Sequence, residues 1–352
     1  MNIDDLDTPT PVIDLDLVEK NVHRAQDYAN RHGIALRPHI KTHKLPEFAH
    51  LQLRAGACGI TCQKIGEAEV MADAGITDIL ISFNIVGRAK LERLRSLARR
   101  VSLKVVADSE AVLRGLSETF SGEMRPLPVL IECDTGAGRC GVATPEAVAA
   151  LAKLVTELPG LSFRGLMTYP PKHRLPDVAG WLEAARAACR RAGIDVPEIS
   201  SGGTPDLYHA HEQNMVTEYR PGTYIYSDRS QVAQGHGTLE DCALRIVATV
   251  VSRPAEDRCI IDAGSKTLSS DTQGLSGFGH IVEYPQMGIV GLSEEHGHCH
   301  VPPGSKGPEV GERVTIIPNH VCVVTNLFDR IPAVRNGRVE AMFTVAARGK
   351  VQ

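Results

Sequence analysis

The feature that most restricts the fold of this chain is a regular alternation between short apolar runs and segments with helical periodicity. Continuous apolar runs bounded by turn residues are typical of strands buried on both faces. Eight β-α units in succession predict a (β/α)8 TIM-type barrel, with a doubly wound parallel sheet as the structural alternative. The predicted strands are 34–41, 57–63, 78–83, 101–108, 128–134, 161–168, 196–200 and 217–226.

Two predicted helices carry clear end signals. Asp16 and Glu19 form a capping-box pattern at the start of the first helix, and Gly33 offers a C-terminal stop. Thr144 suits the N-cap and Pro145 the first position of another helix. Both helices lie where the β-α alternation requires them.

The pattern changes after residue 235. Helical periodicity becomes rare, and short β-type runs appear at 245–251, 258–261 and 313–317. Asn336 and Gly337, flanked by apolar residues, predict a tight hairpin turn. We therefore expect two domains, a barrel over residues 16–235 and a C-terminal β domain over residues 236–352.

Charge and cysteine content limit the function classes. The net charge is −4, from 38 basic and 42 acidic residues, and no long block of like charges occurs, so neither a nucleic-acid partner nor a membrane surface is expected. The first ten residues do not form a secretory signal, and no apolar run is long enough to span a bilayer. The nine cysteines form no Cys-x-x-Cys pair, which favours reduced thiols and a cytoplasmic protein.

The stretch RPHIKTHK, residues 37–44, ends the first predicted barrel strand. A lysine at a barrel mouth, near other cations, loses part of its preference for the charged form, and the free amine can form a Schiff base. Lys41 and His39 share strand alternation and should point to the same side. Lys44 is a weaker candidate, and an exposed lysine pair is the alternative interpretation.

A second strand end carries Gly202, Gly203 and Thr204. The glycines allow close approach of the backbone to a ligand, and Thr204 followed by Pro205 could open a helix whose N-terminus attracts an anion. Asp206 would oppose an anion unless it points away. A plain strand-to-helix turn is the alternative.

Two more strand ends add donors. Gly222 and Thr223 lie within or after the last predicted strand and could bind the same phosphate, although a turn beside a core tyrosine is equally consistent with the pattern. Arg139 lies in a glycine-rich loop and could pair with an oxygen anion, or with Asp134. A lysine for an aldehyde, a phosphate site and an arginine for a phenolate together match pyridoxal phosphate.

His320 and Cys322 suggest a metal site in the second domain. Their spacing puts both on one face of a strand, with Val321 facing the other way, and imidazole with thiolate favours zinc. A core cysteine beside an unrelated histidine is the alternative. The segment 296–300 contains more potential ligands, but its glycine and the prolines that follow it predict a mobile loop.

These motifs, taken in order, resemble the D-threonine aldolase and D-serine dehydratase family, pyridoxal-phosphate enzymes of fold type III with the alanine-racemase-like fold. The resemblance extends over nearly the whole chain. It rests on Asp7-Thr8-Pro9, Arg37-Pro38-His39-Ile40-Lys41-Thr42-His43-Lys44, Gln63-Lys64-Ile65-Gly66-Glu67-Ala68, Gly138-Arg139-Cys140-Gly141-Val142, Ser201-Gly202-Gly203-Thr204-Pro205, Pro221-Gly222-Thr223-Tyr224, Ser293-Glu294-Glu295-His296-Gly297 and His320-Val321-Cys322.

The resemblance implies a role for each of these segments. It implies that residues 1–15 complete the β domain, that the protein is a homodimer, and that the substrate is a small D-amino acid. The implied site consists of Lys41 as the Schiff-base lysine, Gln63, Arg139 and Tyr169 at the cofactor, Gly202, Gly203, Thr204, Gly222, Thr223 and Tyr224 at the phosphate, and His320 and Cys322 at a divalent metal such as zinc, manganese or cobalt.

One departure from the family pattern concerns the catalytic base. Aldolases of the family often follow the ring-contacting tyrosine with His-Gly, whereas Tyr169 is followed here by Pro170-Pro171-Lys172-His173. His173 is the candidate base for the β-hydroxyl group. We expect retro-aldol cleavage of a D-3-hydroxy amino acid to glycine and an aldehyde. The alternative is dehydration of such a substrate, or of D-serine, to a 2-oxo acid and ammonia. The His-x-Cys pair favours this alternative.

Overall fold

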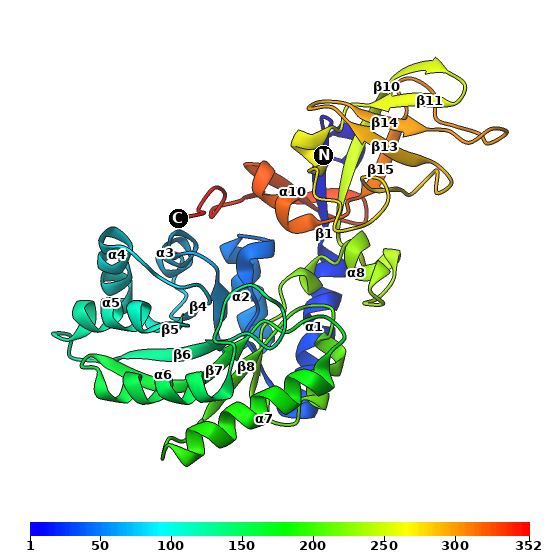
Figure 1. The fold of residues 1–352 in the computed structure, drawn as a ribbon. Coiled ribbons are helices and arrows are strands. Elements are labelled where there is room, and N and C mark those ends of the chain that lie inside the picture. The colour runs from blue at the N-terminus through cyan, green and yellow to red at the C-terminus, as the bar shows by residue number, and fades with distance from the viewer. The chain divides into compact units, whose positions relative to one another are not determined.

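The chain forms two compact units in the computed structural model, which describes residues 1–352 (Figure 1). One unit comprises Met1–His23, Thr42–Leu45 and Thr223–Gly349, and is called here the β unit. The other comprises Arg24–Lys41, Pro46–Gly222 and Lys350–Gln352, and is called the barrel unit. The border at Gly222 precedes the predicted one at residue 235, because the segment after it is hydrogen-bonded to the β unit: the Ser230 N–H donates to the Asn319 carbonyl at 3.2 Å.

The barrel unit contains an eight-stranded parallel sheet in the order β2-β9-β8-β7-β6-β5-β4-β3. Hydrogen bonds from Cys58 N–H to Leu36 O (2.9 Å) and from Thr61 N–H to Pro38 O (2.8 Å) close the sheet, so the barrel prediction is confirmed. The strands are β2 (Ala35–Leu36), β3 (Ile60–Cys62), β4 (Asp78–Ile81), β5 (Ser102–Ala107), β6 (Leu127–Cys133), β7 (Leu161–Thr168), β8 (Glu198–Ser201) and β9 (Glu218–Tyr219).

Two barrel strands are much shorter than predicted. β2 ends before Pro38 and β9 before Pro221, because proline has no N–H with which to continue a ladder. The chain then forms the 3-10 turns η2 (Ile40–Thr42) and η4 (Thr223–Ile225). The residues predicted to end these strands therefore lie on turns.

Helices follow the strands around the outside of the barrel (Figure 1). They are α1 (Leu15–His32), α2 (Pro46–Ala55), α3 (Ile65–Asp73), α4 (Arg88–Ala98), α5 (Glu110–Phe120), α6 (Pro145–Glu157) and α7 (Leu175–Arg191). The cap of α6 is as predicted, since the Thr144 hydroxyl accepts a hydrogen bond from Ala147 N–H at 3.3 Å. No helix is both long and apolar enough to cross a membrane.

The capping-box prediction for α1 is wrong. Asp14 caps this helix, because its carboxylate accepts a hydrogen bond from Leu17 N–H at 3.0 Å. Asp16 and Glu19 lie inside the helix, and both pair with Arg335. The C-terminal stop at Gly33 is confirmed by its left-handed conformation, with φ of +65°.

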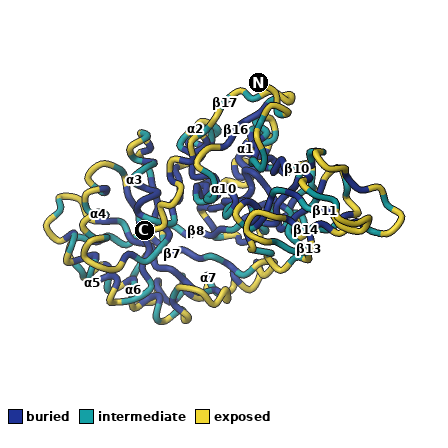
Figure 2. Tube along the Cα trace, turned by 90° about the horizontal axis from the view of Figure 1, so that it is seen from above, coloured by how far each residue is buried: buried dark blue, intermediate teal, exposed yellow.

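The barrel interior combines an apolar layer with charged groups. Leu80, Val106, Leu130 and Met167, from four neighbouring strands, form a buried cluster. The barrel strands are buried, as the dark blue of β7 and β8 in Figure 2 shows. Close packing of this interior holds the barrel strands in place.

The β unit is built on an antiparallel sheet with β1 inside it. β1 pairs antiparallel with β10 and parallel with β16, so the N-terminal strand is part of this sheet. The strands are β1 (Thr10–Asp14), β10 (Leu244–Ala255), β11 (Arg258–Ile261), β12 (His280–Ile281), β13 (Gly288–Leu292), β14 (Gly297–His300), β15 (Arg313–Ile317), β16 (Arg330–Arg335) and β17 (Arg338–Thr344). Short helices are η1 (Ile3–Asp5), α8 (Arg229–Ala233), η5 (Leu239–Asp241), α9 (Ser265–Leu268) and α10 (Val321–Leu327).

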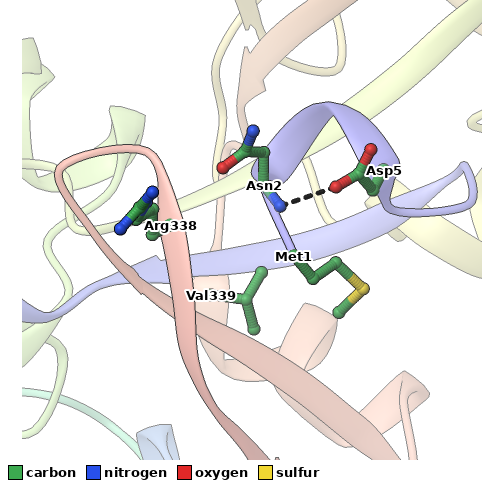
Figure 3. A pocket seen from close by; sticks show the side chains of 5 residues that line it. All are labelled: Met1, Asn2, Asp5, Arg338 and Val339. Carbon is green, nitrogen blue, oxygen red and sulfur yellow. Dashed lines mark hydrogen bonds between the residues drawn. The ribbon is translucent and has the colours of Figure 1, made fainter.

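The predicted hairpin between β16 and β17 is confirmed. Asn336 and Gly337 both have positive φ, +50° and +75°, as a two-residue turn of this kind requires. The N-terminus packs beside it, where a cavity of about 550 Å³ is lined by Met1, Asn2, Asp5, Arg338 and Val339 (Figure 3). The Asp5 carboxylate there accepts the Asn2 N–H at 2.7 Å, and the cavity contains no histidine, cysteine or lysine.

Candidate functional site

The predicted residues of the barrel unit lie beyond the C-terminal ends of its strands. Lys41 is on η2 after β2, Gln63 follows β3, Arg139 is in the loop after β6, Tyr169 follows β7 and Gly203 follows β8. In (β/α)8 barrels this end of the sheet holds the active site. The fold therefore brings these residues to the end of the barrel where ligands bind.

Lys41 is held beside a neutral histidine. Its backbone N–H donates to Nδ1 of His39 at 3.4 Å, and His39 Nε2 donates to Gln63 Oε1 at 3.0 Å. Burial, and after it the charge of Lys41, hold the pKa of His39 well below its usual value. Lys41 lies on η2 and not on a strand, so the predicted strand alternation does not relate the two side chains.

Lys44 has a structural position. It is buried, has a left-handed backbone with φ of +56°, and its ammonium group donates to the Ala347 carbonyl at 3.3 Å within the β unit. The interpretation of RPHIKTHK as an exposed lysine pair is therefore wrong. Lys41 is the partly exposed lysine of the two.

Arg139 and Tyr169 form a stacked pair. The guanidinium carbon lies 4.5 Å from the centre of the tyrosine ring, a cation–π distance. The Asp134 carboxylate accepts the N–H groups of Gly136 and Gly138 at 2.9 and 3.1 Å, which shapes the loop that carries Arg139. The stacked pair presents one cation and one phenol.

Two buried charged residues near this end of the barrel were not selected from the sequence. Burial raises the pKa of Glu132 to about 7, although Arg139 opposes the effect. Burial lowers the pKa of Arg220 to about 10, and its guanidinium donates to Thr168 O at 2.8 Å and to Ser200 Oγ at 2.6 Å. Arg220 directly precedes the motif Pro221-Gly222-Thr223-Tyr224, but its burial inside the fold cannot be read from the sequence.

The two glycines after β8, Gly202 and Gly203, differ in the structural constraint that acts on them. A Cβ on Gly202 would lie 2.9 Å from the Arg220 carbonyl oxygen, so Gly202 is required by packing. Gly203 has φ of +124°, and its nearest neighbours would be Pro205 and Tyr169 at 3.8 Å. These are ordinary van der Waals distances, so packing does not require glycine here. A glycine backbone beside an aromatic ring can approach a phosphate closely, which fits pyridoxal phosphate.

The helix predicted to begin at Thr204 is absent. The six-residue 3-10 helix η3 (Leu207–Glu212) begins later, with Asp206 at its N-cap position. The Thr204 carbonyl accepts Leu207 N–H at 3.1 Å in the turn that precedes it. A helix N-terminus therefore does not contribute to an anion site here.

His173 is held by Asp206. Its Nδ1 lies 3.2 Å from Asp206 Oδ1, and its backbone N–H donates to the same carboxylate at 3.1 Å. His173 has a left-handed backbone with φ of +57°. Both residues line a cavity of about 200 Å³ together with Leu175, Pro176, His209 and Glu212.

The metal pair of the β unit is at a helix start, and not on a strand as predicted. β15 ends before Pro318, and His320 occupies the N-cap position of α10. His320 Nδ1 lies 3.0 Å from Oδ2 of Asp228, which is completely buried and which the sequence did not single out. Burial lowers the pKa of His320, but Cys322 and Asp228 outweigh it and raise the value to about 10.

Cys322 is flanked by two hydroxyl groups. Thr42 Oγ1 lies 3.2 Å and Thr223 Oγ1 3.7 Å from its sulfur, all within the β unit. Thr223 and Tyr224 are both buried on η4. Of the residues assigned to the phosphate, these two therefore belong to the β unit, and Gly202 to Thr204 and Gly222 to the barrel unit.

The donor set of His320 and Cys322 fits a divalent metal. Because Nδ1 is bound to Asp228, Nε2 is the nitrogen that can act as a ligand, and a buried carboxylate behind an imidazole is the usual support of a metal-binding histidine. Residues 1–352 contain no cluster of three or more His, Cys, Asp or Glu side chains arranged to hold a metal. The pair would therefore leave positions for water or substrate.

The histidine-rich segment 296–300 is a strand and not a mobile loop. It forms β14, in which Cys299 is buried opposite Cys259 of β11. His298 Nε2 lies 3.0 Å from Ser293 Oγ. β14 is hydrogen-bonded to β11 on one side and to β13 on the other, which explains why this segment is a regular strand.

Comparison with known proteins gives consistent matches over the whole chain. A family model described as the N-terminal domain of alanine racemase matches residues 13–230, and one described as a putative serine dehydratase domain matches residues 243–334. A D-threonine aldolase of an Arthrobacter species is 38% identical, over 98% of this chain and 93% of that protein. A D-threo-3-hydroxyaspartate dehydratase of a Delftia species is 31% identical, over 90% and 91%. The crystal structure of D-threonine aldolase from Filomicrobium marinum superimposes with a TM-score of 0.93 at 34% identity, over 100% and 98% of the two chains.

Proposed function

The chain belongs to the D-threonine aldolase and D-serine dehydratase family with the alanine-racemase-like fold, and on that premise we propose that it is an aldolase. It is a lyase of D-hydroxy amino acids, as its relatives are. The proposed reaction cleaves a D-3-hydroxy amino acid of the D-threonine type into glycine and an aldehyde.

The observation that carries the choice of an aldolase is the higher identity to a D-threonine aldolase (38%) than to the dehydratase (31%). The choice of a lyase over a racemase is carried by the pair of His320 and Cys322 with Asp228 behind it. A racemase on the same fold exchanges one proton at Cα and has no use for a metal at the β-position. A lyase that acts on a β-hydroxyl group needs that oxygen to be polarised. An imidazole with its Nδ1 fixed at 3.0 Å from a buried carboxylate suits this task.

Pyridoxal 5'-phosphate would be held by residues of the family motif. It would supply an electron sink for the charge left on Cα when a bond to that carbon breaks. Lys41 would anchor its aldehyde group, next to the neutral imidazole of His39. The other contacts would come from Gln63, Arg139, Tyr169, Gly202, Gly203, Thr204, Gly222, Thr223 and Tyr224.

Side chains of the protein would carry out the proton transfers of the reaction. His173 would take the proton of the β-hydroxyl group, after which the Cα–Cβ bond breaks and its electron pair remains with Cα. The oxygen then forms the aldehyde carbonyl, and Cα receives one proton to give glycine. His320 and Cys322 would hold a divalent ion (zinc, manganese or cobalt) that acts as a Lewis acid toward the hydroxyl oxygen.

Dehydration is the alternative, and two observations favour it. The second metal-binding residue is a cysteine, and the Delftia relative is a dehydratase. In that reaction Lys41 would remove the Cα proton and hydroxide would leave from Cβ. Hydrolysis of the resulting enamine then gives a 2-oxo acid and ammonia.

A product assay separates the two reactions. Purified protein with pyridoxal phosphate and a divalent metal is given D-threonine, with and without a chelator. Acetaldehyde and glycine in equal amounts are expected, and Lys41→Ala should abolish both. Formation of 2-oxobutanoate and ammonia would reject the aldolase in favour of the dehydratase.

A further inference from the structure

We propose that Asp206 is a positioning residue for His173, which it holds so that Nε2 is the nitrogen that takes the proton of the β-hydroxyl group. This inference rests on the proposed function, because it assumes that His173 is the base. Asp206 is not itself placed at the substrate and acts through the histidine.

The carboxylate of Asp206 contacts both parts of His173. One oxygen lies 3.2 Å from Nδ1 of the ring, and the carboxylate also accepts the backbone N–H at 3.1 and 3.2 Å. A carboxylate beside Nδ1 favours the tautomer that carries its proton on that nitrogen, which leaves Nε2 as the basic nitrogen. The backbone contact holds the residue that carries the ring.

The location of Asp206 supports this role over a local structural one. Asp206 occupies the N-cap position of η3, where an aspartate ordinarily accepts a hydrogen bond from its own helix. Its side chain makes no such capping bond. Because Asp206 is buried, at 5% exposure, its charge must be compensated, and His173 supplies the donors.

The backbone of His173 is also unusual. A non-glycine residue with φ of +57° is held against its conformational preference by its surroundings, here in part by the Asp206 carboxylate that accepts its N–H. The preceding Pro170 and Pro171 restrict the loop on the other side. The backbone of His173 is therefore restricted by the prolines that precede it and by Asp206, whereas its side chain is 56% exposed and accessible to a ligand.

The same cavity offers a matched control. His209 Nδ1 lies 2.8 Å from Oε1 of Glu212, but both residues are exposed and lie three apart on η3. This second imidazole–carboxylate pair is a surface pair that requires no support from the fold. Glu212→Gln removes the same charge from the same cavity without touching His173.

The test is a double-mutant cycle on the holoenzyme with D-threonine as substrate. Asp206→Asn keeps an oxygen that can accept the His173 N–H, so the loop remains supported. We expect Asp206→Asn to lower kcat about 10- to 100-fold, with KM changed less than about threefold, and Glu212→Gln to leave both unchanged. In a His173→Ala background Asp206→Asn should cause no further loss. Multiplying losses, or a wild-type kcat in Asp206→Asn, would overturn the proposal.

A spectroscopic measurement tests the pairing without activity. Nitrogen NMR of protein labelled at histidine, with the His173 signals assigned by their absence in His173→Ala, should show the Nδ1–H form in the wild type. Asp206→Asn should change that form, whereas identical spectra would overturn the inference. If the wild type gave no lyase product, the proposed function would fail, and the spectra would still decide whether Asp206 sets the imidazole.

Discussion

Replacing Asp228 by asparagine tests how the β unit supports its metal pair. Oδ1 of Asp228 accepts hydrogen bonds from Ser230 Oγ (2.7 Å) and Gln231 N–H (2.9 Å). Oδ2 accepts from His320 Nδ1 (3.0 Å) and Val321 N–H (3.2 Å). The asparagine oxygen can replace Oδ1, but its amide group is a donor where Oδ2 accepted.

The magnitude follows from the two donors that lose their acceptor. A buried donor left without a partner costs about 1–3 kcal/mol. With two such donors, one of them on the fully buried Val321, we expect the free energy of unfolding to fall by about 2–4 kcal/mol. Because the imidazole also loses its orientation, affinity for cobalt should fall about 10- to 100-fold.

Two measurements on the same variant check this reasoning. Urea unfolding followed by far-UV circular dichroism gives the stability, and the thiolate-to-cobalt absorption band during a metal titration gives the affinity. Asp329→Asn is the control, since it removes the same charge from an exposed pair with Arg348 and should change stability by less than about 1 kcal/mol. Lost stability with unchanged cobalt affinity would show that Asp228 only supports the fold, and a variant equal to the wild type in both would refute the argument entirely.

Two further predictions concern the barrel unit. Gly203→Ala should lower the free energy of unfolding by about 1–3 kcal/mol, because a φ of +124° strains any side chain. The same variant should bind pyridoxal phosphate more weakly in an absorbance titration. The control Gly180→Ala, at a position of α7 with no atom near the added Cβ, should lower neither the stability nor the binding. Burial raises the pKa of Glu218, but Arg37 and Lys104 outweigh it and lower the value to about 2, against 4.5 in the unfolded chain. The ionised Glu218 therefore contributes about 3 kcal/mol to the free energy of unfolding above pH 5, and this contribution is lost as pH falls through 2. Urea unfolding followed by Trp181 fluorescence should show that the free energy of unfolding depends less on pH in Glu218→Gln than in the wild type.

The barrel was predictable because parallel strands are buried on both faces. Each strand then appears in the sequence as an uninterrupted apolar run, and all eight predicted runs overlap an observed strand. The lengths of the first and last runs were overestimated. Pro38 and Pro221 were visible in the sequence, and giving more weight to their missing N–H groups would have shortened both strands.

The local structure of His320 and Cys322 could not be predicted from their spacing in the sequence. Residues two apart share a face of a strand, but His320 and Cys322 are close for another reason, since they flank the first residue of α10. The two residues were selected because of a local structure that they do not have. The support from Asp228 lies 92 positions earlier in the chain, and no local pattern connects the two.

Asp206 and Asp228 share a feature that explains why neither was selected. Each stands at the N-cap position of a short helix, η3 or α8, where an aspartate is expected for local reasons alone. A carboxylate has two oxygens, however, and a cap uses one of them. Asp228 caps α8 with Oδ1 and binds His320 with Oδ2, whereas Asp206 leaves its helix uncapped and binds His173.

Burial separates these two aspartates from ordinary caps. An exposed capping aspartate has its second oxygen in water, which needs no further partner. A buried one must bind donors with both oxygens or lose several kcal/mol of solvation. A buried N-cap aspartate therefore implies a second donor from elsewhere in the fold, and in each unit of this chain that donor belongs to a histidine of the proposed site.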